Sequence, residues 1–539
     1  MAGIKFSRKE FEKSIKLTDE IKEKISLMKT HFESMNEEEV ELEITPDRPD
    51  LYSLQGFLRA WNSFSGKTKG LKEYKINKSD AKIIVDKSVE GVRPYSMAAI
   101  VKGVNFTDEK IKEIMQWQEK IHSTFGRNRK KVALGYYDLA KVKFPIKYMA
   151  KEPKEIEFEP LDMPERMNAL QILSRHPCGR DYGNQLDGMK KFPVYYDANN
   201  NVLSMPPIIN SNKSGKINQG VTEVLIECSG FDLETLKRTI TLAVVDLVDQ
   251  RGKAYSVDVV YKNKSERISF TPEKKKLNIE NVNKLLGLEL KEADVKKLLE
   301  KMGYNYSKGI VEVPAYRTDI MHEVDIIEDI AIAYGYENFK PEIPSIATIG
   351  EIDKKEIIKN KISEILTGLG LIELSSYHLI TKEDLEKSGE KAIEVEKSKS
   401  DYKFLRPNLL LSTFKILSEN IDSEYPQKIF EIGRSFQLDD KEETGIKEKA
   451  SLVVALTPGN FTEGKQTMDY LARMLGIEFE IIEGKEKGFI EGRVGKILFE
   501  NQEIGIIGEI HPLTLKSWKL KMPLVMLDID LEKIFEKLI

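Results

Sequence analysis

The alternation of apolar and polar residues divides the start of the chain into short amphipathic elements. Residues 9–30 repeat apolar positions at helical spacing, and the run VELEIT that begins at Val40 alternates as a strand does. A proline-rich turn and a second amphipathic helix, DLYSLQGFLRAWNSF, follow it. These patterns predict a first small module of helices and strands over residues 1–75.

The rest of the chain divides into three further stretches. Residues 76–262 contain short β-like runs between turns and then the helical pattern LETLKRTITLAVVDLVDQRG, which predicts an α+β domain. Residues 263–343 combine helices that have Lys-rich faces with the strand GIVEVPAY. Residues 344–539 mix helices with strands such as KASLVVAL and EIGIIGEI, which predicts an antiparallel sheet. The predicted fold class is therefore α+β and multidomain.

Length and composition exclude several classes of protein. A chain of 539 residues is too long for one hydrophobic core, and no apolar run reaches the roughly 18 residues that span a bilayer. The N-terminus is charged and lacks the apolar segment of a secretory signal, so we expect a cytoplasmic protein without a membrane partner. Cys178 and Cys228 are too few for a disulfide framework or a zinc knuckle. A net charge of −4 excludes a polycation and still permits a local basic face.

One short pattern occurs twice in the chain, 269 residues apart. LEITPDRPDL from Leu42 and VEVPAYRTDI from Val311 align without a gap, with Arg48 on Arg317 and Asp50 on Asp319. Each copy reads as a strand, a proline-containing turn and an Arg-x-Asp that opens a helix, where the Asp is expected to cap the first turn. The pattern predicts that one supersecondary unit is used twice, with chance matching of short motifs as the alternative.

An acidic cluster follows the second copy, in RTDIMHEVDIIEDIAIAYGY. In a helix, the isoleucines form one face, and Asp325, Glu328 and Asp329 share the opposite face near Asp319. At the offset of 269 the first copy has Gly56, Arg59 and Ala60, so the unit does not need these acids to fold. A hard cation such as Mg²⁺ explains the cluster, and a solvated helix face explains it equally well from the pattern alone.

Other stretches suggest chemistry less directly. GNFTEGKQT, from Gly459, nearly matches a phosphate-binding P-loop, but Gln466 stands where a Ser or Thr hydroxyl must reach Mg²⁺, so we interpret it as an ordinary loop. No HExxH or GxSxG spacing is present. The segments SMPPIINSNKSGKI and TEVLIECSG place Asn210, Ser211, Glu227 and Ser229 as groups for a polar pocket, with a plain turn between strands as the alternative.

Several motifs in order resemble one known family. They are ELEITPDRPDLYSLQGFLRA, SMPPIINS with TEVLIE, YRTDIMHEVDIIEDIAIAYGYEN, LRPNLLLSTFKILSENI, KIFEIGRSF and IGIIGEIHP. Taken together, they resemble the β subunit of phenylalanyl-tRNA synthetase, of the archaeal and eukaryotic cytosolic type. The resemblance covers essentially the whole chain.

The resemblance implies an α2β2 heterotetramer that joins phenylalanine to tRNA(Phe) with ATP and Mg²⁺, with the aminoacylation site on the α subunit. It further implies winged-helix-like small modules, an editing domain at 76–262, a B5-like metal-binding module at 263–343, and a class II synthetase-like domain without a catalytic site at 344–539. In that last domain Gln437 follows Phe436 where the class II strand carries an ATP-reading Arg.

The resemblance also implies two sites. The editing domain hydrolyses tRNA mischarged with tyrosine, and its pocket falls on Asn210, Ser211, Glu227 and Ser229, although the family often has Asp and Thr at the last two positions. Glu227 is suited to accept the tyrosine hydroxyl. The family's Mg²⁺ site falls on four carboxylates and leaves out Glu323; the four are Asp319, Asp325, Glu328 and Asp329.

Two alternatives belong to other functional classes. One is a non-catalytic RNA-binding scaffold that has lost editing, and the other is an independent P-loop NTPase.

Overall fold

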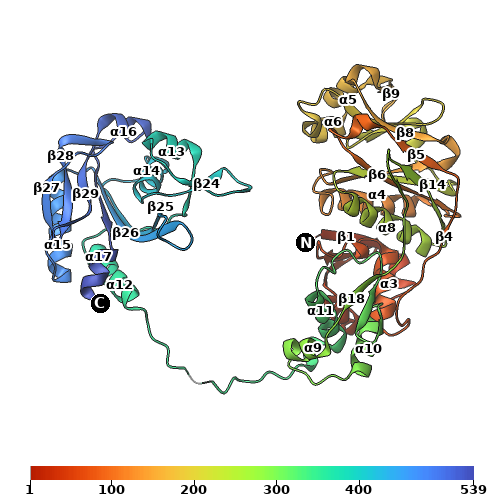
Figure 1. The fold of residues 1–539 in the computed structure, drawn as a ribbon, viewed down its shortest axis with the longest axis horizontal. Helices are drawn as coiled ribbons and strands as arrows, with labels where there is room; N and C mark the ends of the chain where they lie inside the picture. Colours follow the sequence, from red (N-terminus) through yellow and green to blue (C-terminus); the bar gives the residue numbers. More distant parts are fainter. Residues whose placement is uncertain (1, 347) are drawn as a thin grey trace. The chain divides into compact units, whose positions relative to one another are not determined.

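The computed structural model describes residues 2–346 and 348–539, which form two compact units (Figure 1). The units part between residues 342 and 343, one residue from the expected start of the last domain. The division of the first unit into three domains stays a prediction. Within the described ranges, no helix is long and apolar enough to cross a membrane.

The first module is a three-stranded antiparallel sheet covered by helices. Its elements are β1 (Ala2–Ser7), α1 (Arg8–Glu12), α2 (Asp19–Ser26), β2 (Thr30–Met35), β3 (Glu39–Ile44) and α3 (Leu54–Phe64). The strands lie in the order β1-β3-β2, and alternate residues such as Ile4 and Leu42 are buried. The single helix expected over residues 9–30 is wrong, because Thr18 accepts a hydrogen bond from the Ile21 amide and starts a second helix.

Two sheets form the central part of the first unit. Its elements are β4 (Ile76–Asn77), β5 (Lys82–Val85), β6 (Tyr95–Lys102), α4 (Asp108–Ser123), β7 (Val132–Asp138), β8 (Ile146–Lys151), β9 (Glu157–Phe158), β10 (Met167–Asn168), α5 (Ala169–Arg175), α6 (Pro177–Tyr182), β11 (Phe192–Tyr196), β12 (Val202–Met205), β13 (Ile209–Asn210), α7 (Asn212–Gly215), β14 (Glu223–Gly230), α8 (Leu233–Asp249), β15 (Lys253–Ser256), β16 (Asp258–Val260) and β17 (Ser265–Glu266). One sheet has the order β4-β15-β6-β14-β7 and the other β13-β12-β11-β8-β5-β16-β17. The amphipathic α8 packs on β6 and β14.

The third module repeats the strand, turn and helix of the first. Its elements are β18 (Glu273–Lys276), α9 (Ile279–Leu286), α10 (Glu292–Lys301), β19 (Asn305–Ser307), β20 (Ile310–Val313) and α11 (Glu323–Tyr334). The strands lie in the order β18-β20-β19, and α11 begins 269 residues after α3, the offset at which the motifs align.

The capping expected from the two Arg-x-Asp motifs is wrong. Ser53 caps α3 through the Gly56 amide, and His322 and Asp325 form a capping box on α11. Asp50 and Asp319 instead pair with the arginines of their own motifs.

The second unit is built on a mostly antiparallel seven-stranded sheet. Its elements are α12 (Lys354–Gly368), β21 (Ile372–Glu373), β22 (Leu379–Thr381), α13 (Lys382–Ser388), β23 (Ile393–Glu394), β24 (Tyr402–Leu405), α14 (Leu410–Glu419), β25 (Gln427–Leu438), β26 (Ile446–Thr457), α15 (Phe461–Leu475), β27 (Glu480–Glu483), β28 (Phe489–Phe499), β29 (Gln502–Ile510), α16 (Pro512–Ser517), β30 (Val525–Asp530) and α17 (Glu532–Leu538). The strand order is β21-β25-β26-β30-β29-β28-β27, in which only β21 and β25 pair in parallel. A mixed α/β multidomain fold, as expected from the sequence, is therefore confirmed.

Candidate functional site

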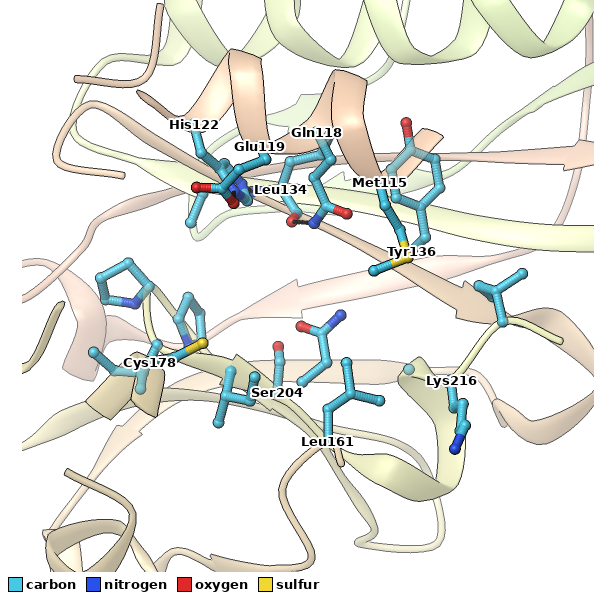
Figure 2. Close-up of a pocket in the computed structure, with 18 of the residues that line it drawn as sticks. Met115, Gln118, Glu119, His122, Leu134, Tyr136, Leu161, Cys178, Ser204 and Lys216 are labelled. Carbon is cyan, nitrogen blue, oxygen red and sulfur yellow. Dashed lines mark hydrogen bonds and ion pairs between the residues drawn. The ribbon is translucent and has the colours of Figure 1, made fainter. Parts of the chain in front are cut away.

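A cavity of about 480 Å³ opens in the central part of the first unit. One wall comes from α4, β7 and β14, and the other from the chain between Leu161 and Ile217 (Figure 2). The close-up shows Gln118, Glu119 and His122 on the first wall facing Cys178 and Ser204 on the second. Most of the lining is apolar, and a few polar groups converge on it, as is usual for a small-ligand site.

Glu227 forms one polar part of this cavity. It lies on β14 opposite Gly135 of β7, and a Cβ at residue 135 would approach the Glu227 Oε1 atom to 2.9 Å. Glycine therefore makes room for the carboxyl group. The Tyr137 hydroxyl lies 2.8 Å from Glu227 Oε1 and 3.3 Å from the Asn210 side-chain oxygen. Glu227 Oε2 and the Ser204 hydroxyl are buried and make no hydrogen bond.

Burial changes the acidity of Glu227. The loss of hydration raises the pKa of its carboxyl from an ordinary value near 4.5 to about 7, and the hydroxyls of Tyr137 and Tyr195 and the charge of Arg93 oppose that rise. Near neutral pH this carboxyl therefore exchanges between its acid and its carboxylate. A buried, unpaired oxygen on such a group costs free energy until a ligand donates a hydrogen bond to it.

The raised pKa predicts how Glu227→Gln changes stability with pH. The contribution of Glu227 to stability is full below pH 4.5, where this carboxyl is protonated in both the folded and the unfolded chain, and it is lost as pH rises through 7. We expect the Gln variant to be more stable than wild type by about 3 kcal/mol at pH 8 and by under about 1 kcal/mol at pH 5. Urea unfolding at the two pH values measures this difference.

A matched control for this prediction is Glu223→Gln, on the same strand. Glu223 is partly exposed and pairs with Lys102, so its substitution should have a small effect at both pH values. A Glu227→Gln effect of equal size at pH 5 and pH 8 would contradict the raised pKa.

The structure brings together two of the four expected pocket residues. Asn210 and Glu227 line the cavity, whereas Ser211 and Ser229 are not among the residues that line it. Ser211 caps the short helix α7. The Ser229 hydroxyl accepts a hydrogen bond from Arg93 Nε at 3.0 Å, and Arg93 also donates to the Ser229 carbonyl. Ser229 therefore positions a buried arginine behind Glu227.

A second polar group of the cavity surrounds Glu119. Its carboxylate lies 3.5 Å from the Arg129 guanidinium and accepts a hydrogen bond from the Tyr182 hydroxyl, and that guanidinium stacks over the Tyr182 ring. His122 Nε2 accepts from the Leu134 amide, which places the proton of the neutral imidazole on Nδ1, 4.0 Å from Glu119. Burial lowers the pKa of His122 to about 4, so the ring stays neutral at pH 7.

The cavity does not contain an activated nucleophile among its described residues. Cys178 lines it, but burial raises the pKa of the thiol and so suppresses the reactive thiolate. His122 lacks a hydroxyl or thiol to activate, since its Nδ1 faces Glu119. The groups present are suited to binding a ligand and a water molecule.

The sequence interpretation missed Ser204 and Tyr137, which adjoin Glu227. Ser204 precedes the Pro206–Pro207 pair by two residues and lies in the strand β12, in which all four residues are buried. Tyr137 is a wholly buried aromatic residue on β7 whose polar tip alone reaches the carboxyl group. Neither carries a spacing signal, because Tyr137 reaches Glu227 through the pairing of β7 with β14, and Ser204 belongs to the other sheet.

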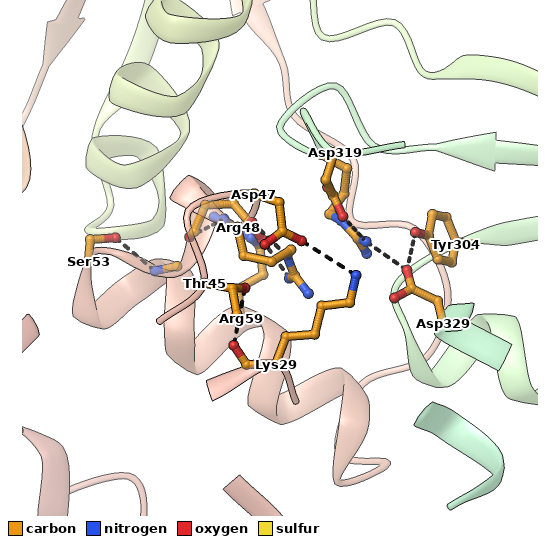
Figure 3. A network of polar contacts seen from close by, with 12 residues as sticks. Lys29, Thr45, Asp47, Arg48, Ser53, Arg59, Tyr304, Asp319 and Asp329 are labelled. Atoms are coloured by element: carbon orange, nitrogen blue, oxygen red, sulfur yellow. Dashed lines mark hydrogen bonds and ion pairs between the residues drawn. The ribbon is translucent and has the colours of Figure 1, made fainter. Parts of the chain in front are cut away.

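The acidic cluster of α11 forms a network with basic residues (Figure 3). Arg317 binds both oxygens of Asp319, at 2.9 and 2.7 Å, and donates a further bond of 2.7 Å to Asp329. The Tyr304 hydroxyl also donates to Asp329, whose other oxygen, Oδ1, is buried and has no partner. Burial opposes ionisation of Asp319, yet the Arg317 charge holds the pKa of this carboxyl well below its usual range.

The first module supplies the other half of this network. Arg48 binds both oxygens of Asp50 at 2.8 Å, which repeats the geometry of Arg317 and Asp319. Lys29 lies 2.7 Å from Glu328 and 3.5 Å from Asp47. The repeated motif therefore serves to hold buried ion pairs where the first and third modules meet.

The four predicted metal ligands lie in one region and have different partners. Asp325 accepts from the amides of Met321 and His322 at 2.7 Å, and Glu328 is held by Lys29. Across residues 2–346 and 348–539, three or more His, Cys, Asp or Glu side chains nowhere form a group arranged to hold a metal ion. Glu323, left out of the predicted set, binds Asn278 and Asn281 instead.

The P-loop-like segment of the second unit makes its contacts within the chain itself. At the P-loop-like segment, Glu509 accepts from the Phe461 amide, Asn460 caps α15, and Gly464 packs against Val525. On β25, Gln437 is exposed. The buried Arg406 of this unit binds Glu431 at 2.9 Å and Ser376 at 2.6 Å.

Comparisons with known proteins agree with this organisation. The family model "Phenylalanyl tRNA synthetase beta chain CLM domain" matches residues 340–531, and "tRNA synthetase B5 domain" matches residues 275–336. A crystal structure of an N-terminal fragment of the phenylalanyl-tRNA synthetase β-subunit from Pyrococcus horikoshii superimposes with a TM-score of 0.60 at 36% identity. It covers 62% of this chain and 100% of the fragment. The chain is thus a subunit of the aminoacyl-tRNA synthetase class.

Two complete relatives name the family. The phenylalanine–tRNA ligase β subunit of Pyrococcus abyssi is 38% identical over 502 residues, 91% of this chain and 90% of that one. The one from Archaeoglobus fulgidus is 35% identical over 536 residues, 96% of each chain. The chain belongs to the family of phenylalanine–tRNA ligase β subunits. A β subunit implies an α partner and a tRNA, and enzymes of this family use Mg²⁺ in aminoacylation.

Proposed function

We propose that the chain works as the β half of an α2β2 heterotetramer in the cytoplasm, where the α subunit charges tRNA(Phe) with phenylalanine and ATP. In this proposal the small modules have a winged-helix-like fold and residues 344–539 have a class II synthetase-like fold without a catalytic site. The exposed Gln437 and the neutralised Arg406 support that assignment, because the transfer of a phosphoryl or nucleotidyl group needs a preorganised cation.

The cavity around Glu227 is proposed to hydrolyse tRNA(Phe) that carries tyrosine. The observation that carries this proposal is the Glu227 Oε2 atom, which is buried without a hydrogen-bond partner at a cavity of about 480 Å³ that Ser204 also lines. An active site that selects phenylalanine by apolar contacts rejects an added hydroxyl by only about 10²-fold. A second site that binds the hydroxyl supplies the remaining discrimination.

Selection of tyrosine follows from hydrogen bonding. The phenol hydroxyl donates a hydrogen bond to the Glu227 carboxylate, and Ser204 and Asn210 also line the cavity. Phenylalanine in the same position leaves Glu227 Oε2 buried and unpaired, and a site of this kind rejects an analogue that lacks the hydroxyl by up to about 10⁴-fold. Burial of Glu227 therefore serves specificity at the expense of stability.

Ester hydrolysis needs only a positioned water molecule. The water oxygen attacks the carbonyl carbon and the bond from that carbon to the ribose oxygen breaks. One proton of the water passes to the ribose oxygen and the other is released to solvent as the tyrosine carboxyl group ionises. The neutral His122 presents Nδ1–H, and Arg129 lies beside Glu119 as a fixed cation. These groups orient water and the ester, and the His122 ring does so in its neutral form because burial lowers its pKa to about 4.

Deacylation of preformed Tyr-tRNA(Phe) by the purified αβ complex tests this function. We expect rapid hydrolysis, and its absence would favour the alternative, an RNA-binding scaffold that has lost editing. The chain in isolation should show no phenylalanine-dependent exchange of ATP with pyrophosphate. Such exchange would contradict the division of roles between the subunits.

A Mg²⁺ ion at the acidic cluster is proposed as a separate feature. Asp319, Asp325, Glu328 and Asp329 supply the hard carboxylate oxygens that Mg²⁺ prefers, and Asp329 Oδ1 is buried without a partner, but as they stand the four are not arranged to hold an ion. Arg317 and Lys29 neutralise these acids in the structure, so Lys29 must release Glu328 when the ion binds. The bound ion would supply a fixed positive charge for contact with the α subunit.

The metal prediction is tested with Asp325→Ala combined with Asp329→Ala. We expect this double variant to lose bound Mg²⁺, measured by elemental analysis of the dialysed complex, and to bind the α subunit more weakly. Glu323→Ala is the matched control on the same helix turn and should retain the ion. Equal metal content in the double variant and the wild type would leave the cluster as an ion-pair network alone.

A further inference from the structure

A second, smaller cavity opens beside the one that Glu227 lines. Its volume is about 220 Å³, and its lining includes Arg93, Lys130 and Phe231. Pro207 lines both cavities, so the two are neighbours. A volume below the roughly 300 Å³ of an ordinary ligand pocket suits one small chemical group rather than a whole substrate.

Arg93 is a buried cation without a carboxylate partner. It is 2% exposed, and within residues 2–346 and 348–539 it forms no ion pair. Its Nε atom donates to the Ser229 hydroxyl at 3.0 Å, and Nη2 donates to the carbonyls of Ser229 and Arg129 at 2.7 and 3.1 Å. Nη1 has no hydrogen-bond partner among these residues. Three other buried arginines each bind a carboxylate: Arg48, Arg317 and Arg406.

The surroundings of Arg93 favour an anion. Burial lowers the pKa of its guanidinium, because the cation loses hydration that no adjacent carboxylate replaces. Glu227 attracts this cation through space without forming an ion pair with it. A buried charge without a counter-ion is costly, whereas an anion that accepts a hydrogen bond from Nη1 satisfies both the charge and the open donor.

The loop between α4 and β7 brings further positive charge to this cavity. Residues 127–131 read RNRKK, and the first three have φ angles of 50°, 54° and 64°. Each non-glycine residue in this left-handed region costs roughly 1–2 kcal/mol. The Gln185 side chain donates to the Asn128 carbonyl at 2.7 Å and helps to hold the turn. The turn places Lys130 at the cavity, where it forms no ion pair in the part of the chain that the structure describes.

Phe231 adds an exposed aromatic ring to the same cavity. Its side chain is 53% exposed, and the Arg93 guanidinium lies 5.4 Å from the centre of its ring. Cations beside an exposed ring are the combination with which proteins bind single-stranded nucleic acid, because the cations hold phosphates and a base stacks on the ring. A free inorganic anion has no use for the ring, so the set of groups favours a nucleotide of a strand.

We propose that the small cavity binds one phosphodiester group of a single-stranded RNA end, with Arg93 and Lys130 on the phosphate and Phe231 against the base. The RNA is the one whose tyrosyl ester occupies the neighbouring cavity, so this inference rests on the proposed editing function and adds a phosphate site to it. A phosphate held beside Pro207 fixes the position of the strand relative to Glu227. The small cavity therefore positions the RNA and takes no part in bond cleavage.

A non-hydrolysable probe tests this site separately from editing. The probe is a single-stranded RNA tetranucleotide with a CCA end that carries tyrosine through a stable amide, and its affinity for the αβ complex is measured by fluorescence anisotropy. Lys130→Ala should weaken binding about tenfold, the usual size of a lost charged contact. Lys131→Ala is the matched control, since it removes the same charge from the same loop and does not line the cavity. Equal effects of the two variants would mean a diffuse basic loop and would overturn the proposal.

Neutral linkages locate the phosphate. Each phosphodiester of the probe is replaced in turn by an uncharged methylphosphonate. One linkage should weaken binding to the wild type at least about tenfold and binding to Lys130→Ala less than about threefold, because the variant has already lost a partner of that charge. Arg93→Gln should show the same loss of coupling, with its urea midpoint as the check on folding. If no linkage is coupled to Lys130, the proposal is wrong.

Phe231→Leu distinguishes an RNA strand from a free anion. This variant should bind the probe about tenfold more weakly, because stacking of a base contributes about 1–3 kcal/mol. Inorganic phosphate should compete with the probe at the same concentration in Phe231→Leu and in the wild type. Unchanged probe affinity in Phe231→Leu would assign the cavity to a free anion and overturn the proposal. Probe binding with this pattern but without hydrolysis of Tyr-tRNA(Phe) would support the phosphate site and contradict editing alone.

Discussion

Substitution of Glu227 by alanine is expected to slow hydrolysis of Tyr-tRNA(Phe) by the complex about a hundredfold in kcat/KM. The variant removes the carboxylate oxygen that has no partner in the folded chain, and with it the acceptor for the phenol. Loss of a hydrogen bond to a charged group costs about 1.5–3 kcal/mol in binding, which accounts for the size of the effect. Single-turnover deacylation with preformed Tyr-tRNA(Phe) measures it.

Two further variants show whether the effect belongs to the carboxylate. Glu223→Ala, on the same strand but paired with Lys102 at the surface, should edit normally. Glu227→Gln keeps an acceptor oxygen and should fall between alanine and wild type. Charging of tRNA(Phe) with phenylalanine should be unchanged in all three, because that reaction is assigned to α. Normal editing by Glu227→Ala would place the site elsewhere.

Replacement of Arg317 by alanine is expected to destabilise the first unit by about 3–5 kcal/mol, the cost of breaking a buried ion pair from one side. Arg317 is buried and binds both oxygens of Asp319 and one of Asp329, so its loss leaves two buried carboxylates without their cation. Arg317→Lys should recover little of this lost stability, because an ammonium group cannot bind one carboxylate through two parallel hydrogen bonds and also reach a second carboxylate.

Urea unfolding followed by hydrogen exchange in the first unit measures this loss. Arg434→Ala is the control, because its ion pair with Glu448 is exposed and should contribute less than about 1 kcal/mol. Similar effects of the two alanine variants would contradict the account of a buried network between the first and third modules.

Periodic patterns predicted the elements that local sequence determines. The helix α8 packs on a sheet with its apolar positions, so LETLKRTITLAVVDLVDQRG carries the signal of its own burial. The repeat was also visible, since α3 and α11 begin at the same offset as the aligned motifs. The break between α1 and α2 was missed because amphipathic spacing continues across Thr18.

The roles of the acidic residues were harder to predict because their partners are remote in sequence. Lys29 of the first module pairs with Glu328. Arg317 precedes α11 and donates to Asp329, twelve residues later within that helix. Neither contact leaves a spacing signal. The motif position of Asp50 and Asp319 suggested helix caps, but a bidentate arginine two residues earlier competes more strongly for both oxygens than backbone amides do.

Two of the four residues predicted for the pocket line the cavity, and the other two have partners that the sequence does not reveal. Asn210 and Glu227 were suggested by composition and by resemblance, and both line the cavity. Ser211 and Ser229 belong to the same segments, but the pleat and the start of α7 direct them to other partners. Ser204 lies on a buried strand of the other sheet, and only the three-dimensional structure shows that it lines the same cavity as Glu227.

The central claim is that the cavity recognises the tyrosine hydroxyl, and the most direct measurement compares two substrates. Under single-turnover conditions, the complex is given Tyr-tRNA(Phe) and Phe-tRNA(Phe) at equal concentration, and the two rates of ester hydrolysis are measured. The account predicts that the tyrosyl ester is hydrolysed at least about 10²-fold faster. Equal rates would contradict it, because they would mean that Glu227 and Ser204 do not read the hydroxyl.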